Sequence, residues 1–183
     1  TLSEVGLSSE VRAAALMNLG IVELWAYRLE GEGRHLEQGL ELAQRIELRY
    51  VQVGCLSHLA VLDAWHSFMA VRERCAQAVA VADAHGLSKE PVVCVALTML
   101  GLMDVAQGRF ETAQGWRDRA EAAVREDVVP ATALLLHRAR GMQHLSQGRL
   151  EQALATLRVA ERLQGLLVTP HALTAQMREW IVL

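Results

Sequence analysis

A period of about 40 residues constrains the fold of this chain more than any other feature, because self-similarity at such a period is typical of stacked structural repeats. The three prolines, Pro91, Pro130 and Pro170, are almost evenly spaced, and each precedes an apolar run. Because proline is tolerated in the first turn of a helix, the three positions predict three helix starts. We therefore expect several copies of one unit.

Small residues recur in the same phase as the prolines. The spacing from Gly101 to Ala113 is identical to the spacing from Gly141 to Ala153. Small side chains at a helix crossing let two backbones approach closely. Gly101→Leu is accordingly expected to lower stability strongly, because the crossing there should have no room. The phase extends backwards more weakly, with anchors at Gly20, Leu59, Gly101 and Gly141.

Each repeat is interpreted as two helices joined by a tight turn. Gly108 and Gly148 supply backbone freedom between the helices, and Gly86 and Gly165 mark the ends of second helices. First helices are expected at about 10–26, 51–66, 91–107, 130–147 and 170–183. Second helices are expected at about 29–48, 68–85, 110–126 and 150–164.

The expected fold class is all-α, a right-handed superhelix of antiparallel helix pairs. Hydrophobic residues make up 52% of the chain and aromatics only 4%, which favours helices packed through small side chains. One helix pair cannot bury both faces, so stacking hides them and leaves a concave surface. We expect one domain over 1–183, a fragment of a longer polypeptide, because Thr1 begins the chain and an apolar run ends it. Its repeats are 8–49, 50–86, 90–126, 130–165 and a partial fifth over 170–183.

Charge and cysteine content narrow the classes of partner. The formal net charge is −3, and Lys89 is the only lysine, whereas nucleic-acid binding requires a concentrated cationic surface. Direct nucleic-acid contact by this segment is not expected. Apolar stretches are broken by charges before they reach the length needed to span a membrane, so no membrane partner is expected.

Cys55, Cys75 and Cys94 are widely spaced, which predicts buried free thiols in a reducing cytosol.

The repeat motif resembles the tetratricopeptide repeat. Gly108 and Gly148 each begin a run of Gly, Arg, Phe or Leu, Glu, a polar residue and Ala, and a further Ala follows at the same distance in both repeats. The first two repeats match in spacing but carry Tyr27 and His66 in place of the turn glycine. A period of about 40 exceeds the usual length of roughly 34 residues, which points to a variant with longer helices and loops.

Three segments of the first half, 18–26, 35–43 and 54–60, resemble the helical-repeat region of large bacterial LuxR-family transcriptional regulators of the MalT-like type. The resemblance covers most of the chain. It implies a cytoplasmic segment between an ATPase module and a helix-turn-helix DNA-binding module, which senses small-molecule inducers or protein partners. The chain has no Gly-x-x-x-x-Gly-Lys-[Ser/Thr] motif and no basic recognition helix. Nucleotide and DNA binding would therefore belong to other parts of such a protein.

The tetratricopeptide resemblance also implies a ligand groove, because first helices line the concave face of such stacks. The implied groove is mostly apolar, which suits a peptide, a partner helix or an amphipathic small molecule. Alternatively, these residues pack against further repeats or a second copy of the chain in a homodimer. The tryptophans Trp25, Trp65, Trp116 and Trp180 are core residues or, alternatively, ligand-stacking residues. The implied groove residues are Met17, Trp25, Asp63, Thr98, Leu102, Arg138 and Met142.

The sequence predicts no catalytic residue, no metal ligand and no cofactor. His137 and His144 lie two helical turns apart on one helix, about 10 Å, too far to share a metal without a third element. Asp63 and His66 could form a general-base pair, but no motif places a nucleophile beside them, so a local or exposed pair is favoured. The main hypothesis is a sensor and protein-interaction domain. A stand-alone peptide-binding adaptor and an enzyme hidden in a helical array are the alternatives.

Overall fold

The computed structural model describes residues 6–26, 28, 31, 33–64, 66–125 and 129–167. All regular secondary structure in these ranges is helical, so the predicted all-α class is confirmed. The partial fifth repeat, with Pro170 and Trp180, lies outside the described residues, as do Tyr27 and Trp65. The chain forms two compact units, residues 1–88 and 89–183, which divide between the second and third predicted repeats.

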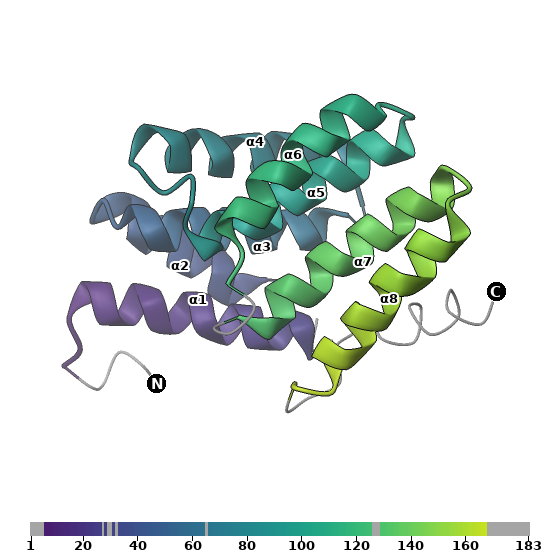
Figure 1. Cartoon of the computed structure of the whole chain (residues 1–183). Coiled ribbons are helices and arrows are strands. Elements are labelled where there is room, and N and C mark those ends of the chain that lie inside the picture. Colours follow the sequence, from purple (N-terminus) through teal and green to yellow (C-terminus); the bar gives the residue numbers. More distant parts are fainter. Residues whose placement is uncertain are drawn as a thin grey trace. The chain divides into compact units, whose positions relative to one another are not determined.

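In the part of the first unit that the structure describes, four α-helices form two pairs (Figure 1). They are α1 (Ser9–Trp25), α2 (Arg34–Arg45), α3 (Arg49–Asp63) and α4 (Phe68–Ala84). α1 packs on α2 and α3 packs on α4, while α3 also contacts both helices of the first pair. This central place explains why every residue from 51 to 61 is buried.

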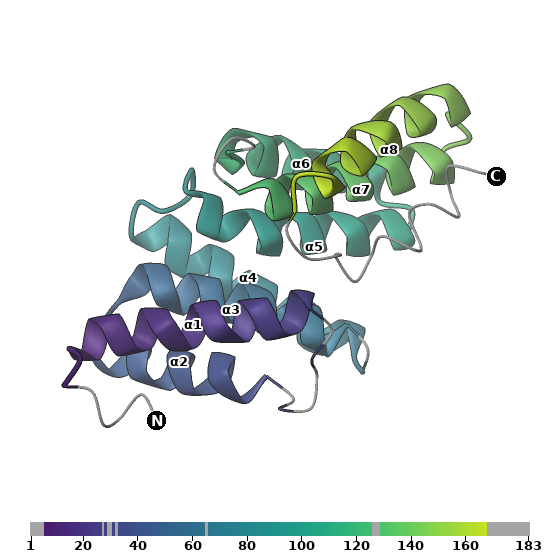
Figure 2. The same cartoon turned by 90° about the horizontal axis from the view of Figure 1, so that it is seen from below.

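The second unit repeats the scheme with the short 3-10 helix η2 (Pro91–Val93), α5 (Cys94–Ala106), α6 (Phe110–Ala123), α7 (Pro130–Ser146) and α8 (Leu150–Gln164). α5 pairs with α6 and α7 with α8, and α7 also contacts α5 and α6. Figure 1 and Figure 2 both show α7 and α8 side by side, running in opposite directions. Pro91 opens η2 and Pro130 opens α7, as the sequence predicted.

The turns of the third and fourth repeats have the same geometry. Gly108 and Gly148 adopt φ of +71° and +70°, a backbone region that glycine enters without steric cost. In each turn the following amide donates a 2.8 Å hydrogen bond to a carbonyl of the preceding helix, Arg109 to Asp104 and Arg149 to His144. The predicted turn role of both glycines is confirmed. Gly165 follows α8 as predicted, but its φ of −65° is an ordinary helical value.

Most helix ends lie close to their expected positions, and α2 is the exception. It begins at Arg34 rather than near residue 29, because Gly33 immediately before it has a left-handed backbone with φ of +80°. α3 ends at Asp63, and the Ser67 hydroxyl then caps α4 by accepting a 3.3 Å hydrogen bond from the amide of Ala70. Serine is a favoured residue at such a position.

The helix crossings are tight at two of the anchor glycines. A Cβ atom on Gly20 would lie 2.5 Å from Cγ of Leu36, and one on Gly141 would lie 2.6 Å from a methyl carbon of Leu157. At Gly101, in contrast, the nearest atoms would be 3.6 Å and 3.7 Å away, an ordinary contact distance. The expectation that the crossing at Gly101 has no room is therefore wrong.

The three cysteines are free and buried, as predicted. Burial raises the pKa of each thiol to about 12, because the charged thiolate is poorly solvated in the interior. These thiols pack as small apolar side chains.

Candidate functional site

The space at Gly101 arises from a single substitution in the repeat pattern. Leu36 follows Gly20 at the same spacing at which Leu157 follows Gly141, and in both repeats the leucine fills the crossing. The residue at this spacing after Gly101 is Arg117. Its side chain is not among the nearest neighbours of a Cβ built at Gly101, so the crossing is left partly open.

A pocket occupies this open crossing between α5, α6 and α7. Its cavity volume is about 20 Å³, and the rest of the recess is open to solvent. The enclosed space is that of about one water molecule, far below the usual size of pockets for drug-sized ligands, so a larger group extends into the open part of the recess. Apolar side chains form most of the wall, from α5 and α7: Leu97, Leu102, Val105, Leu136 and Ala139.

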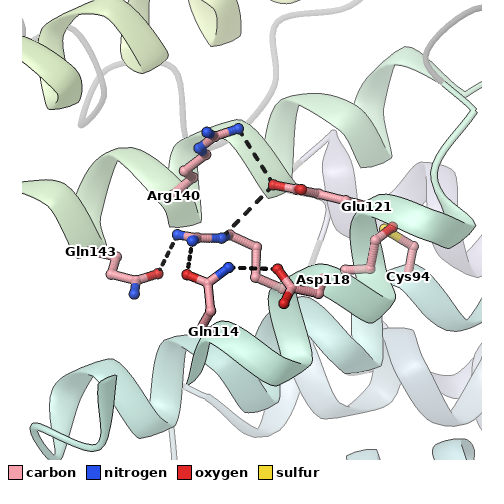
Figure 3. Close-up of polar contacts among 8 residues, drawn as sticks. Cys94, Gln114, Asp118, Glu121, Arg140 and Gln143 are labelled. Carbon is pink, nitrogen blue, oxygen red and sulfur yellow. Dashed lines mark hydrogen bonds and ion pairs between the residues drawn. The ribbon is translucent and has the colours of Figure 1, made fainter. Parts of the chain in front are cut away.

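Arg117, Arg140 and Gln143 form the polar end of the pocket, which we call the arginine end. Arg117 Nη1 donates a 2.7 Å hydrogen bond to Oε1 of Gln143, and Nη2 donates to Oε1 of Gln114. Figure 3 shows Gln114 and Gln143 approaching from two different helices. Both acceptors are neutral amides, so these bonds fix the guanidinium in place without cancelling its charge.

One carboxylate is shared by the two arginines of this end. Oε1 of Glu121 lies 3.4 Å from Nη1 of Arg140 and 3.8 Å from Nε of Arg117 (Figure 3). Burial lowers the pKa of Arg117; Glu121 and Asp118 raise it, while Arg140 and Arg149 lower it. Arg117 and the four charged groups that shift its pKa sum to one net positive charge.

The last turn of each first helix carries a further repeated feature. In three repeats a carboxylate there accepts a contact from the following helix, at 2.8 to 3.0 Å: Glu23 with His35, Asp63 with Arg74, and Asp104 with Trp116. His144 takes this place in the fourth repeat. Its Nδ1 is buried and finds no acceptor or donor among the described residues. Burial, followed by Arg149, Arg140 and Arg117, lowers the pKa of His144, so it is neutral at pH 7.

Comparisons with known proteins leave these features to be interpreted from their own geometry. No protein-family model matches the chain, and no curated protein matches it either. The pocket, its arginine end and the unpaired His144 ring nitrogen are thus the features that bear on function.

The implied groove residues of the second unit divide into two groups. Thr98 and Leu102 line the pocket. The Thr98 hydroxyl donates a 2.8 Å hydrogen bond to the Cys94 carbonyl, which leaves its methyl group for the wall. Arg138 and Met142 lie on α7 and do not line the pocket. Arg138 is buried, and burial lowers its pKa to about 10.

The implied groove residues of the first unit are Met17, Trp25 and Asp63. Met17 is buried beside Gly39, at the crossing of α1 and α2. Trp25 is half-buried, and its ring meets His58 edge-on with the ring centroids 6.0 Å apart. Asp63 forms a 2.8 Å ion pair with Nε of Arg74.

Two other interpretations from the sequence can be placed on the structure. His66 is exposed and its backbone amide, not its ring, donates to the Asp63 carbonyl. Trp116 donates a hydrogen bond from Nε1 to the buried Asp104 carboxylate, and the Arg119 guanidinium lies 5.6 Å from the centre of a Trp116 ring.

Within the ranges that the structure describes, no group of three His, Cys, Asp or Glu side chains is placed to hold a metal ion. No helix in those ranges is both long and apolar enough to cross a membrane.

The arginine end was missed at the sequence level, although a signal existed. Alignment of the repeats on Gly20, Gly101 and Gly141 places Arg117 in register with Leu36 and Leu157. A charged residue at a core position marks a break in the local rule, and such breaks concentrate at functional sites. Arg140 and Gln143 carry no comparable signal, because polar residues are frequent on first helices.

Proposed function

We propose that the chain is the ligand-binding helical-repeat segment of a cytoplasmic transcriptional regulator of the LuxR family, MalT-like in type. In this proposal the repeats form a right-handed superhelix of about four units and a partial fifth. The shared packing scheme of the two units and the matching glycine turns support a repeat architecture. The segment senses an effector or partner and passes a change of shape to modules outside it.

The pocket at Gly101 is the observation that carries the binding role. A leucine at position 117 would fill the crossing as it does in two other repeats, with gain of buried apolar area. The chain instead keeps an arginine there and holds it with two side-chain amides. Retaining an arginine where a leucine would pack better favours a role in binding.

A fragment titration on the purified chain tests the binding role. The probes are small carboxylic acids, amines and neutral amides, followed by backbone amide NMR. We expect shifts in α5 and α7 around the pocket, and we expect Ala139→Leu, which adds bulk to the wall, to abolish them. Ala122→Leu adds the same bulk at an exposed position of α6 and should leave binding unchanged. Fragments that leave these amides unmoved, or that bind equally to Ala139→Leu, would remove the pocket as a ligand site.

The full reading frame tests the regulator assignment separately. A Gly-x-x-x-x-Gly-Lys-[Ser/Thr] motif before this segment and a helix-turn-helix pattern after it would support the regulator. A frame that encodes helical repeats alone would overturn it and leave the alternative, a stand-alone adaptor that binds a peptide or a partner helix.

A further inference from the structure

The choice of ligand class begins with unused donors at the arginine end. A guanidinium has five N–H donors, and among the described residues Arg117 makes two hydrogen bonds, both to neutral amides. Its Nε lies 3.8 Å from Glu121, beyond hydrogen-bond length. The Nε of Arg140 is buried and has no acceptor among the described residues. Buried donors of a charged group are costly unless an acceptor meets them.

The charge balance favours an anionic acceptor over a neutral one. The charged groups that act on Arg117 are Arg140, Arg149, Glu121 and Asp118, and Asp118 also accepts a hydrogen bond from Gln114. The neutral His144 adds no positive charge to this set. A ligand with one negative charge would therefore bring the cluster to neutrality, with Arg117 held ready by Gln114 and Gln143.

The remaining wall requires an apolar portion in the same ligand. Leu97, Leu102 and Val105 of α5 face Leu136 and Ala139 of α7 across the pocket. We infer that the pocket binds a small amphipathic organic anion, with its carboxylate at Arg117 and Arg140 and its apolar part against the partly exposed side chains of Leu102, Val105 and Ala139. Carboxylates suit this end because a guanidinium can hold both oxygens at once. The inference rests on the proposed binding role and names the ligand class of the same site.

Three probes of equal chain length separate charge from shape. Hexanoate, hexanamide and hexylamine are titrated into the whole chain and followed by backbone amide NMR. Hexanoate should bind at the pocket at least about tenfold more tightly than hexanamide, the ratio expected for a hydrogen-bonded charge. Hexylamine should not bind. Added salt should weaken the binding of hexanoate and leave that of hexanamide unchanged.

Arg117→Leu is the matched variant, because leucine is the residue that two other repeats use at this position. It should fold, fill the crossing and lose hexanoate binding by about tenfold or more, on the order of one charged hydrogen bond. Arg158→Leu removes the same charge at an exposed position of α8 and should bind hexanoate as the wild type does. If Arg117→Leu does not fold, the salt dependence of the wild type decides the question.

The outcomes separate the inference from the function on which it rests. Equal affinity of hexanoate and hexanamide at the pocket would overturn the anion and keep the binding role. Tight hexanoate binding to folded Arg117→Leu would also overturn the anion site. Absence of any shift near the pocket with all three probes, together with a negative fragment titration, would overturn both.

Discussion

Three positions of the repeat show how one residue decides between a filled and an open helix crossing. Leu36 and Leu157 reach Gly20 and Gly141 so closely that no Cβ fits, whereas Arg117 leaves space at Gly101. The glycines could be predicted from their period, but the space at each could not. The size of this space depends on the side chain that faces the glycine from the second helix. The glycine itself carries no information about that side chain.

The glycines therefore predict opposite results for the same substitution. Gly20→Ala should destabilise the chain by about 1–3 kcal/mol, because the new Cβ meets Leu36 and its backbone nitrogen, which lies 3.0 Å away. Gly101→Ala should be neutral or stabilising by up to about 1 kcal/mol, because the site has room and alanine favours helix. Urea unfolding measures both. Equal losses at the two sites would contradict the difference in space.

His58 predicts a fall of stability in acid. It is buried in the first unit, its Nδ1 lies 2.8 Å from the Gly54 carbonyl oxygen, and burial lowers its pKa from 6.5 to about 4. Between these values the unfolded chain binds more protons, so stability falls as pH decreases through this window. The expected loss from about pH 7.5 to about pH 5 is about 2 kcal/mol.

Urea unfolding at the two pH values tests this loss. His58→Met removes the titrating ring and should reduce the pH dependence by about that amount. His85→Gln changes an exposed histidine of the same unit and should keep the wild-type pH dependence. A wild-type pH dependence in His58→Met would show that another group causes the loss.

At the level of helices and turns, the sequence predicted most of what is observed. Helices begin or end within a few residues of their expected positions at Pro91, Pro130, Gly108 and Gly148. Such residues act through local backbone geometry, which can be predicted from a single sequence. The start of α2 was missed, because Gly33 adopts its left-handed conformation without the motif seen at the other turns.

At the turn glycines, backbone conformation decides whether a substitution by alanine raises or lowers stability. Gly148→Ala should destabilise by about 1 kcal/mol or more, because its φ of +70° is strained for any residue with a Cβ. Gly115→Ala should stabilise by up to about 1 kcal/mol, because Gly115 is exposed inside α6 with open space around it. Thermal unfolding of both variants provides the comparison. A stabilising Gly148→Ala would contradict the left-handed turn.

For the whole molecule, the all-α class could be predicted because the repeat period and the low aromatic content favour helix pairs packed through small side chains. The candidate site could be predicted only in part. Thr98 and Leu102 were named from their place on a first helix, while Arg117 belongs to a second helix that the groove hypothesis excluded. The pocket depends on three helices meeting at one point, and this meeting is a property of tertiary packing.

The cysteines provide a probe of each unit in the intact chain, with Cys55 and Cys75 in the first and Cys94 in the second. All three should resist thiol reagents in native buffer, because burial and the raised pKa of about 12 leave almost no accessible thiolate. In urea all three should label fully, as mass spectrometry of the peptides can show. Rapid native labelling of any one would show that its helix opens readily.

The arginine in place of a leucine has a consequence for how such chains diversify. Since the crossings at Gly20 and Gly141 are filled by their own leucines, one codon change at position 117 can open or fill the crossing at Gly101 without altering the other two. Under the proposed binding role, ligand recognition and folding can then be selected almost independently, and relatives with different effectors would be expected to differ first at this position.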